Sequence, residues 1–147
     1  MSIGNPLAGD WHTFWSPTQG ENGRKGGVCI FIKNNPDIIV LGQGTIVEGR
    51  AIYVTARWKQ HVIGIINVYV PNSLAMRTQF WRQLADGLPI ADAWILAGDF
   101  NMTLHIEDKV GGMHTVVQGS ELVAWDLLMG RMGVKDAWYV LKKPRSS

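Results

Sequence analysis

The chain has 147 residues, of which 46% are hydrophobic, and its formal net charge is +2. This length corresponds to one domain that can bury a core, and the composition excludes a disordered chain. A total charge near zero neither favours nor excludes a polyanionic partner, because a basic groove can coexist with a balanced total. The single cysteine, Cys29, excludes an internal disulfide and favours a reducing compartment. Its apolar neighbours predict that Cys29 belongs to the core.

The N-terminal segment lacks the basic start and the apolar run of a signal peptide. No apolar run approaches the roughly 20 residues that a membrane helix needs. We therefore expect a soluble, intracellular protein without a membrane partner, and the sequence leaves nucleus and cytoplasm open.

Most of the first two thirds of the chain is predicted to be β-strand. Residues 1–25 are rich in Gly, Pro, Ser, Asn and Thr and predict a loop. β-Branched and aromatic runs bounded by glycine or proline then predict strands, with a hairpin turn at Lys59-Gln60. The predicted strands are 28–33, 37–41, 45–48, 50–58, 61–70 and 92–100.

Two segments have the apolar period of an amphipathic helix. The first follows Pro71, can be capped by Asn72 or Ser73, and leaves Arg77, Arg82 and Asp86 outside its apolar stripe. The second is predicted from Ser120 to Gly133, after a polar loop at 103–119. The predicted stripes are Leu74, Phe80, Trp81, Leu84 and Leu88 in the first helix, and Leu122, Trp125, Met129 and Met132 in the second.

This order of elements predicts an α/β layered sandwich, in which strands pack on strands and helices lie outside. A short element at 136–138 follows the second helix, and the residues after it are predicted to form a ragged tail.

The predicted strand that ends in Gly98-Asp99-Phe100-Asn101 carries the main candidate site. Residues 94–97 are apolar throughout, so we expect a central strand, and ligand sites of α/β proteins gather at the carboxyl ends of such strands. Asp99 and Asn101 point to the same side if the extended conformation persists through them. A carboxylate beside a carboxamide suits Mg²⁺ chemistry on phosphate, but both residues are also common in turns, where they bond their own backbone.

Tyr69 ends another predicted strand, in the sequence Asn67-Val-Tyr-Val-Pro-Asn72. A phenol there can hydrogen-bond a phosphate or a developing oxyanion, or it can lie half-buried with its hydroxyl in water. The histidines have no metal-ligand spacing, and the chain has no Walker loop or dinucleotide fingerprint. Taken singly, these residues leave the structural and the functional interpretations open.

Seven segments follow one another along the chain: GGVCIFIK, GRAIYVTARW, NVYVPN, FWRQL, AWILAGDFN, IEDKVGG and GVKDAW. Taken together, these motifs resemble the endonuclease/exonuclease/phosphatase superfamily, above all the apurinic-type endonuclease domains of non-LTR retrotransposons. The resemblance covers about residues 11–138, with a ragged tail at 139–147, and 1–147 would be one incomplete domain, truncated at both ends. It implies a partial four-layered α/β sandwich, with two packed, mainly antiparallel sheets flanked by helices.

The resemblance also implies a function, the Mg²⁺- or Mn²⁺-dependent hydrolysis of DNA phosphodiesters. It gives Asp99 the task of orienting or activating the attacking water, and Asp99 and Asn101 that of holding the metal. Asn101 and Asn72 would contact the phosphate, and Tyr69 would support the phosphate or the leaving side.

The sequence departs from the family pattern at several expected positions. The asparagine and the metal-binding glutamate of the family's first strands have no match, nor do its closing aspartate and Ser-Asp-His motif. Mg²⁺ needs anchoring carboxylates, and the loss of members of a catalytic unit removes most of the rate. We therefore expect weak metal binding and an inactive domain, unless a partner chain supplies the missing segments. The alternatives are a non-catalytic module that binds nucleic acid or protein, and a fragment of a lipid or inositol phosphatase.

Overall fold

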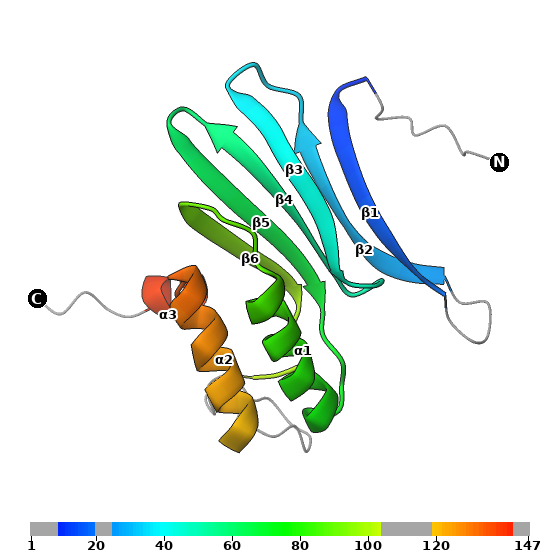
Figure 1. The fold of residues 1–147 in the computed structure, drawn as a ribbon, viewed down its shortest axis with the longest axis vertical. Helices are drawn as coiled ribbons and strands as arrows, with labels where there is room; N and C mark the ends of the chain where they lie inside the picture. The colour runs from blue at the N-terminus through cyan, green and yellow to red at the C-terminus, as the bar shows by residue number, and fades with distance from the viewer. Residues whose placement is uncertain (1–8, 20–24, 104–118, 143–147) are drawn as a thin grey trace, which may run out of the picture.

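The computed structural model describes residues 9–19, 25–103 and 119–142. Its elements follow the order strands, helix, strand and two helices (Figure 1). They are β1 (Trp11–Gln19), β2 (Lys25–Lys33), β3 (Ile38–Val47), β4 (Ala51–Trp58), β5 (His61–Tyr69), α1 (Leu74–Gly87), β6 (Ala93–Asp99), α2 (Gly119–Met132) and α3 (Ala137–Lys142).

Two sheets pack on each other in this structure. Strands β3, β4, β5 and β6 form a four-stranded sheet in that order, and β1 pairs with β2 in a separate antiparallel ribbon. The first three strands of the larger sheet are antiparallel, while β6 runs parallel to β5. Helix α1 makes the crossover between β5 and β6, which is the connection that parallel neighbours require.

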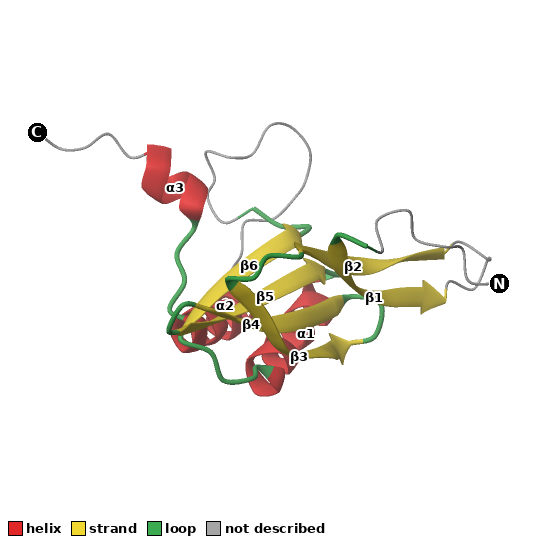
Figure 2. Cartoon of the chain, turned by 90° about the horizontal axis from the view of Figure 1, so that it is seen from above, coloured by secondary structure: helices red, strands yellow, loops and turns green. Residues whose placement is uncertain are grey.

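Two apolar clusters lie on opposite faces of the larger sheet. One cluster joins the sheet to α1 and α2, with Ile66 and Val68 of β5 against Trp81 and Leu84 of α1. The other joins β2 to β4. In Figures 1 and 2 the ribbon of β1 and β2 and the pair of helices accordingly lie on different sides of the sheet. The expected α/β sandwich of two packed sheets with helices outside is confirmed as a partial one.

The N-terminal prediction was wrong, because residues 11–19 form strand β1 rather than a loop. Pairing along the whole of β2 stabilises this strand despite its proline, Pro17. Ser16 is buried, and its Oγ accepts a hydrogen bond from the Gly49 backbone at 2.8 Å. The predicted strands 37–41 and 45–48 are also one strand, β3, whose register shifts between Val40 and Gly42 and again between Thr45 and Val47.

Cys29 is exposed, so its predicted place in the core was wrong. Side chains alternate along a strand, and in β2 the buried set is Val28, Ile30 and Ile32. Cys29 therefore points to the opposite face.

Strand β6 was predicted to be central and buried on both faces, and it is neither. It is the last strand of the described sheet, and Ile95 is 53% exposed. Only Trp94 and Leu96 pack against the helical cluster. One face of β6 is therefore covered and the other is open within the described part of the chain.

The helix boundaries were largely predictable from their caps. Ser73 caps α1 by accepting a hydrogen bond from the Met76 N–H, and Gly133, with φ of 64°, ends α2. Arg77, however, is buried rather than on the solvent side, and Leu74 and Leu122 are exposed rather than in the stripe.

Residues 137–142, part of which was predicted as tail, form α3. The predicted loop at 104–118 lies outside the described residues. The described helices include none long and apolar enough to span a membrane.

Candidate functional site

The motifs that contain Tyr69 and Asp99 meet at one edge of the larger sheet, which here means the end of the sheet at which β5 and β6 finish. Because β5 and β6 are parallel neighbours, their carboxyl ends coincide, and Tyr69 is the register partner of Asp99. The backbone N–H of Val70 donates to the Asp99 carbonyl at 2.9 Å, which extends the pairing one step beyond the strands. Both Tyr69 and Asp99 are exposed. A phenol and a carboxylate are thus held side by side where both strands end.

Asn101 completes this group, but by a different geometry from the predicted one. Its φ of 47° is left-handed, so the extended conformation does not continue beyond Asp99. Asp99 Oδ1 accepts the backbone N–H of Asn101 at 3.0 Å, which is an Asx turn. The Asn101 side chain then reaches across to β5, where Nδ2 donates to the Val70 carbonyl at 2.7 Å. Asp99 and Asn101 are therefore turn residues, joined by a bond from side chain to backbone, and they also belong to the cluster of polar groups at this edge.

Position 98, directly before Asp99, requires a glycine because β6 approaches β5 closely there. Its φ is 135°, and a Cβ built there would lie 2.0 Å from the Val68 carbonyl oxygen and 2.9 Å from Asn67 Oδ1. A residue without a Cβ is needed for this close approach of β6 to β5.

Asn72 lies in the exposed connection between β5 and α1. Its carbonyl accepts a hydrogen bond from Nη1 of the buried Arg77 at 2.5 Å. Among the described residues, no hydrogen bond joins the Asn72 side chain to Asp99 or Asn101. The structure fixes the backbone of Asn72 near the candidate site and leaves its side chain open to solvent.

Arg50 also lies at this edge, and the sequence analysis did not identify it. Its Nη1 donates to the Tyr69 carbonyl at 3.2 Å, and its guanidinium carbon lies 5.2 Å from the centre of the Tyr69 ring. A hairpin between 50–58 and 61–70 with its turn at 59–60 was predicted, and in that register residue 50 lies opposite residue 69. That register was the signal that could have found Arg50.

The site offers part of a ligand set for a divalent cation. Asp99 is exposed, and its Oδ2 and the Oδ1 of Asn101 make no hydrogen bond within the described ranges. One carboxylate and one amide oxygen fit a hard cation that also takes water and phosphate oxygens. In the part of the chain that the structure describes, no group of three or more His, Cys, Asp or Glu residues could hold a metal. His12 lies in β1 and His61 at the hairpin turn, while 105 and 114 fall outside that part.

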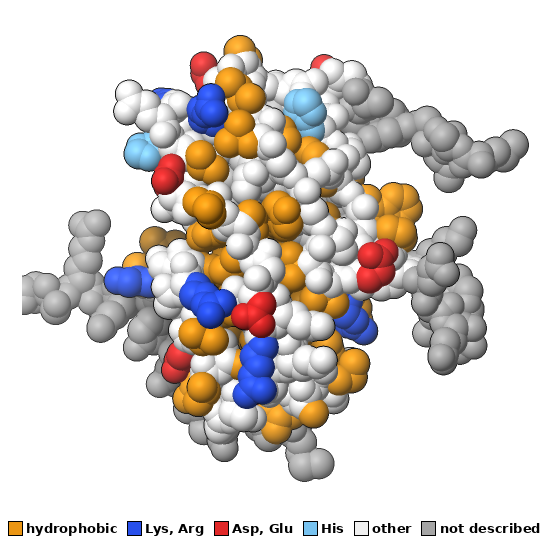
Figure 3. Space-filling model, in the orientation of Figure 1, with side chains coloured by type: hydrophobic (Ala, Val, Ile, Leu, Met, Phe, Trp, Pro, Cys, Tyr) orange, Lys and Arg blue, Asp and Glu red, His pale blue; other side chains and the backbone are white. Residues whose placement is uncertain are grey.

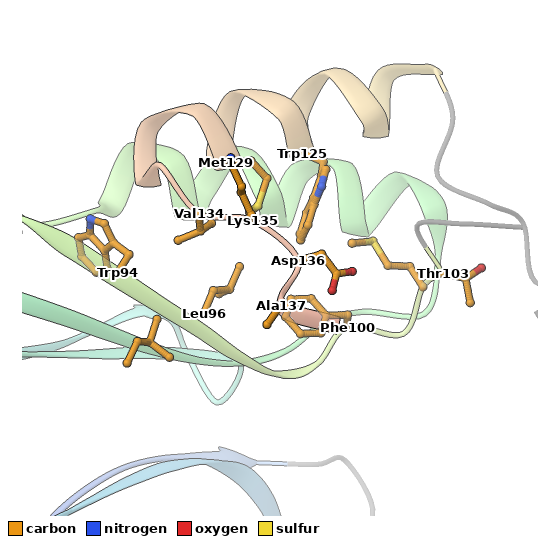
Figure 4. Close-up of a pocket in the computed structure, with 12 residues that line it drawn as sticks. Trp94, Leu96, Phe100, Thr103, Trp125, Met129, Val134, Lys135, Asp136 and Ala137 are labelled. Atoms are coloured by element: carbon orange, nitrogen blue, oxygen red, sulfur yellow. The ribbon is translucent and has the colours of Figure 1, made fainter. Parts of the chain in front are cut away.

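An apolar cavity of about 550 Å³ lies next to this edge (Figure 4). It opens between β6, the C-terminal half of α2 and the start of α3, and Phe100 and Met102 bring it close to Asn101. The hydroxyl of Thr103 is buried and has no hydrogen-bond partner among the described residues. Asp136 is among the residues that line this cavity, whereas Tyr69, Asp99 and Asn101 are not, so the cavity is separate from the candidate site.

Comparisons with known proteins agree with this architecture. No family model matches the chain. Over 86 residues, or 56% of the chain, it is 28% identical to the Transposon TX1 uncharacterized 149 kDa protein of Xenopus laevis, of which it spans 7%. It is also similar to a crystal structure of humanized D. rerio TDP2, with a TM-score of 0.53 and 15% identity over 94% of this chain and 52% of that one. The chain therefore spans about half of the TDP2 chain and a small part of the transposon protein.

The fold and the site thus define an α/β sandwich with a polar site at the carboxyl ends of two parallel strands. TDP2 is a member of the endonuclease/exonuclease/phosphatase superfamily. The shared fold and the transposon relative together support the fold that its motifs predicted, that of the endonuclease/exonuclease/phosphatase superfamily.

Proposed function

We propose that the edge formed by Tyr69, Asp99 and Asn101 is the phosphate-binding part of a metal-dependent site for hydrolysis of DNA phosphodiesters. The observation that carries this proposal is the register pairing of Tyr69 with Asp99, together with the bond from Asn101 to the Val70 carbonyl. These contacts hold a phenol, a carboxylate and a carboxamide at one point of the sheet edge.

Each side chain has a distinct task in this proposal. The Asp99 carboxylate orients the attacking water and, with Asn101 Oδ1, would hold Mg²⁺ or Mn²⁺. Such an ion, when bound, supplies Lewis-acid polarisation of a phosphate oxygen. Because Nδ2 of Asn101 already donates to Val70, the orientation of the amide is fixed before the phosphate arrives. Tyr69 and the exposed Asn72 provide further donors to the phosphate.

DNA is the proposed substrate because 56% of this chain resembles a segment of a transposon protein. The four proposed site residues include one carboxylate, which on its own holds Mg²⁺ weakly. We therefore expect the 147-residue chain to bind DNA but not to hydrolyse it at a measurable rate, unless a further segment or a partner chain completes the site.

The test uses the 147-residue chain, its Asp99→Ala variant and a charge-matched control, Asp126→Ala, at an exposed position of α2. DNA binding is measured by fluorescence anisotropy with and without Mg²⁺, and nicking is measured on supercoiled plasmid with and without an abasic site. We expect Mg²⁺ to strengthen DNA binding in the wild type and in Asp126→Ala, and to have no effect in Asp99→Ala.

Two results would change this interpretation. If the wild-type chain nicks the plasmid and Asp99→Ala does not, this chain has a working hydrolytic site and the expected inactivity is wrong. DNA binding that is equal in all three proteins and independent of Mg²⁺ would reject the metal-dependent site in favour of a non-catalytic binding module.

A further inference from the structure

Arg50 is fixed beside Tyr69 by the pairing of β4 with β5. Ala51 is the register partner of Val68, and the backbone N–H of Tyr69 donates to the Arg50 carbonyl at 2.7 Å. Arg50, Tyr69 and Asp99 therefore follow one another across the same edge, at the ends of three adjacent strands, with Arg50 directly before β4. With a strand spacing of about 4.8 Å, the backbones of Arg50 and Asp99 are about 10 Å apart.

The Arg50 side chain is held in place by two contacts with one residue. Nη1 donates to the Tyr69 carbonyl at 3.2 Å, and the guanidinium carbon lies 5.2 Å from the centre of the Tyr69 ring, a cation–π distance. The turn before β4 is also fixed, because the Arg50 N–H donates to the Val47 carbonyl at 2.9 Å. The guanidinium is thus preorganised, and little side-chain freedom remains to be lost when it binds a ligand.

No acid among the described residues forms an ion pair with Arg50. The ion pairs among the described residues are Arg77 with Glu121 and Arg131 with Asp86, and neither includes Arg50. A guanidinium has five N–H donors, and one of them meets the Tyr69 carbonyl. Figure 3 shows basic and acidic side chains interspersed on one face of the molecule, without a broad basic patch there. Among the described residues, Arg50 is therefore the basic side chain that these contacts place at this edge.

We propose that Arg50 binds a phosphate of a nucleic-acid strand that flanks the phosphate held at Asp99 and Asn101. This inference rests on the proposed function for the nature of the ligand, and it adds a binding residue that selects the substrate class. Because the backbones of the two positions are separated by about two strand spacings, a nucleic-acid strand across this edge has room to place a second phosphate at Arg50. A polynucleotide gains from both contacts, whereas a phosphate monoester, such as a lipid or inositol headgroup would present, gains from one.

The test compares wild type with Arg50→Gln, Arg50→Lys and the control Arg82→Gln, which removes an exposed arginine of α1. Binding of a labelled DNA duplex is measured by anisotropy over a series of salt concentrations, and thermal unfolding shows that each variant is folded. We expect Arg50→Gln to lower affinity about tenfold at low salt and to reduce the slope of log K against log[salt] by about 1. Arg50→Lys keeps the slope but binds more weakly, because an ammonium lacks the planar fork. Arg82→Gln leaves both quantities unchanged.

Competition by inorganic phosphate separates the contribution of Arg50 from that of Asp99. We expect free phosphate to compete equally well against wild type and Arg50→Gln after correction for their DNA affinities. An unchanged affinity and salt slope in Arg50→Gln overturns the proposal, even if Asp99→Ala removes the Mg²⁺ effect and so supports the proposed function. A reduced slope in Arg50→Gln with no effect of Asp99→Ala supports Arg50 as a nucleic-acid contact and rejects the metal-dependent site. A folded wild type that does not bind DNA overturns both.

Discussion

The spacing between the two motif-bearing strands depends on Gly98. Its backbone has φ of 135°, and a Cβ at this position would lie 2.0 Å from the Val68 carbonyl oxygen. Because that oxygen belongs to the backbone of a central strand, the clash cannot be relieved by a side-chain rotation. Any larger residue must push β6 away from β5 and so separate Asp99 from Tyr69.

We expect Gly98→Ala to lower the free energy of unfolding by at least about 2 kcal/mol, because it adds backbone strain to a steric clash. The control is Gly130→Ala in α2, where no atom lies within 4 Å of the added Cβ. That change should raise stability by about 0.5–1 kcal/mol, the helix propensity difference between the two residues. Urea unfolding measures both, and equal stability of Gly98→Ala and wild type would contradict the proposed close approach.

At the scale of elements, a buried ion pair joins α1 to α2. Arg77 Nε lies 2.6 Å from Glu121 Oε1, and both side chains are almost completely buried. Trp81 Nε1 also donates to this carboxylate at 3.4 Å, and Arg77 Nη1 bonds the Asn72 carbonyl. The pair thus connects the helix interface to the turn that precedes α1.

Removing one partner should be more damaging than removing both. Arg77→Met leaves a buried carboxylate without its cation, and Glu121→Leu leaves a buried guanidinium, so each should cost about 3–5 kcal/mol. The double variant removes both charges, and we expect it to be more stable than either single variant. A denaturant double-mutant cycle measures the coupling, and additive effects would contradict a direct interaction.

This pair shows what the sequence could not predict about the helices. The caps at Ser73 and Gly133 are local signals and were predicted correctly, whereas Arg77 reads as polar and its partner lies 44 positions further along the chain. The exposure of Leu74 and Leu122 has the same origin, because the period alone does not tell which side of a helix meets another element.

In the candidate site, too, one part of the arrangement was predictable from the sequence and another part was not. A strand, a helix and a parallel strand bring Tyr69 and Asp99 to one edge, and this juxtaposition follows from the predicted order of elements. The left-handed turn at Asn101 and the contact of Arg50 with Tyr69 depend on tertiary register, which the sequence pattern did not specify.

At the scale of the whole molecule, β4 links two apolar clusters. Its Ala51 packs toward α1 and α2, whereas Ile52 and Val54 pack toward the ribbon of β1 and β2. The cluster between the ribbon and the sheet has five buried residues, whereas the cluster that joins the sheet to the helices has twelve. Two hydrogen bonds reinforce the docking of the ribbon: Asn67 Nδ2 of β5 donates to the Cys29 carbonyl of β2 at 2.7 Å, and the Gly49 N–H donates to Ser16 Oγ of β1 at 2.8 Å. We infer that the ribbon opens more easily than the helical side of the sheet.

Asn67→Ala tests this division of the molecule. Loss of the bond to Cys29 should destabilise the docked ribbon by about 1 kcal/mol, equivalent to roughly fivefold faster amide exchange if the ribbon opens locally. Hydrogen exchange with mass spectrometry should therefore show faster exchange in peptides from β1 and β2, and unchanged exchange in α1 and α2. Gln60→Ala, at an exposed position of the hairpin turn, is the control and should change neither. Equal acceleration on both sides of the sheet would instead mean that the two clusters unfold as one cooperative unit, with β4 transmitting the loss from one face to the other.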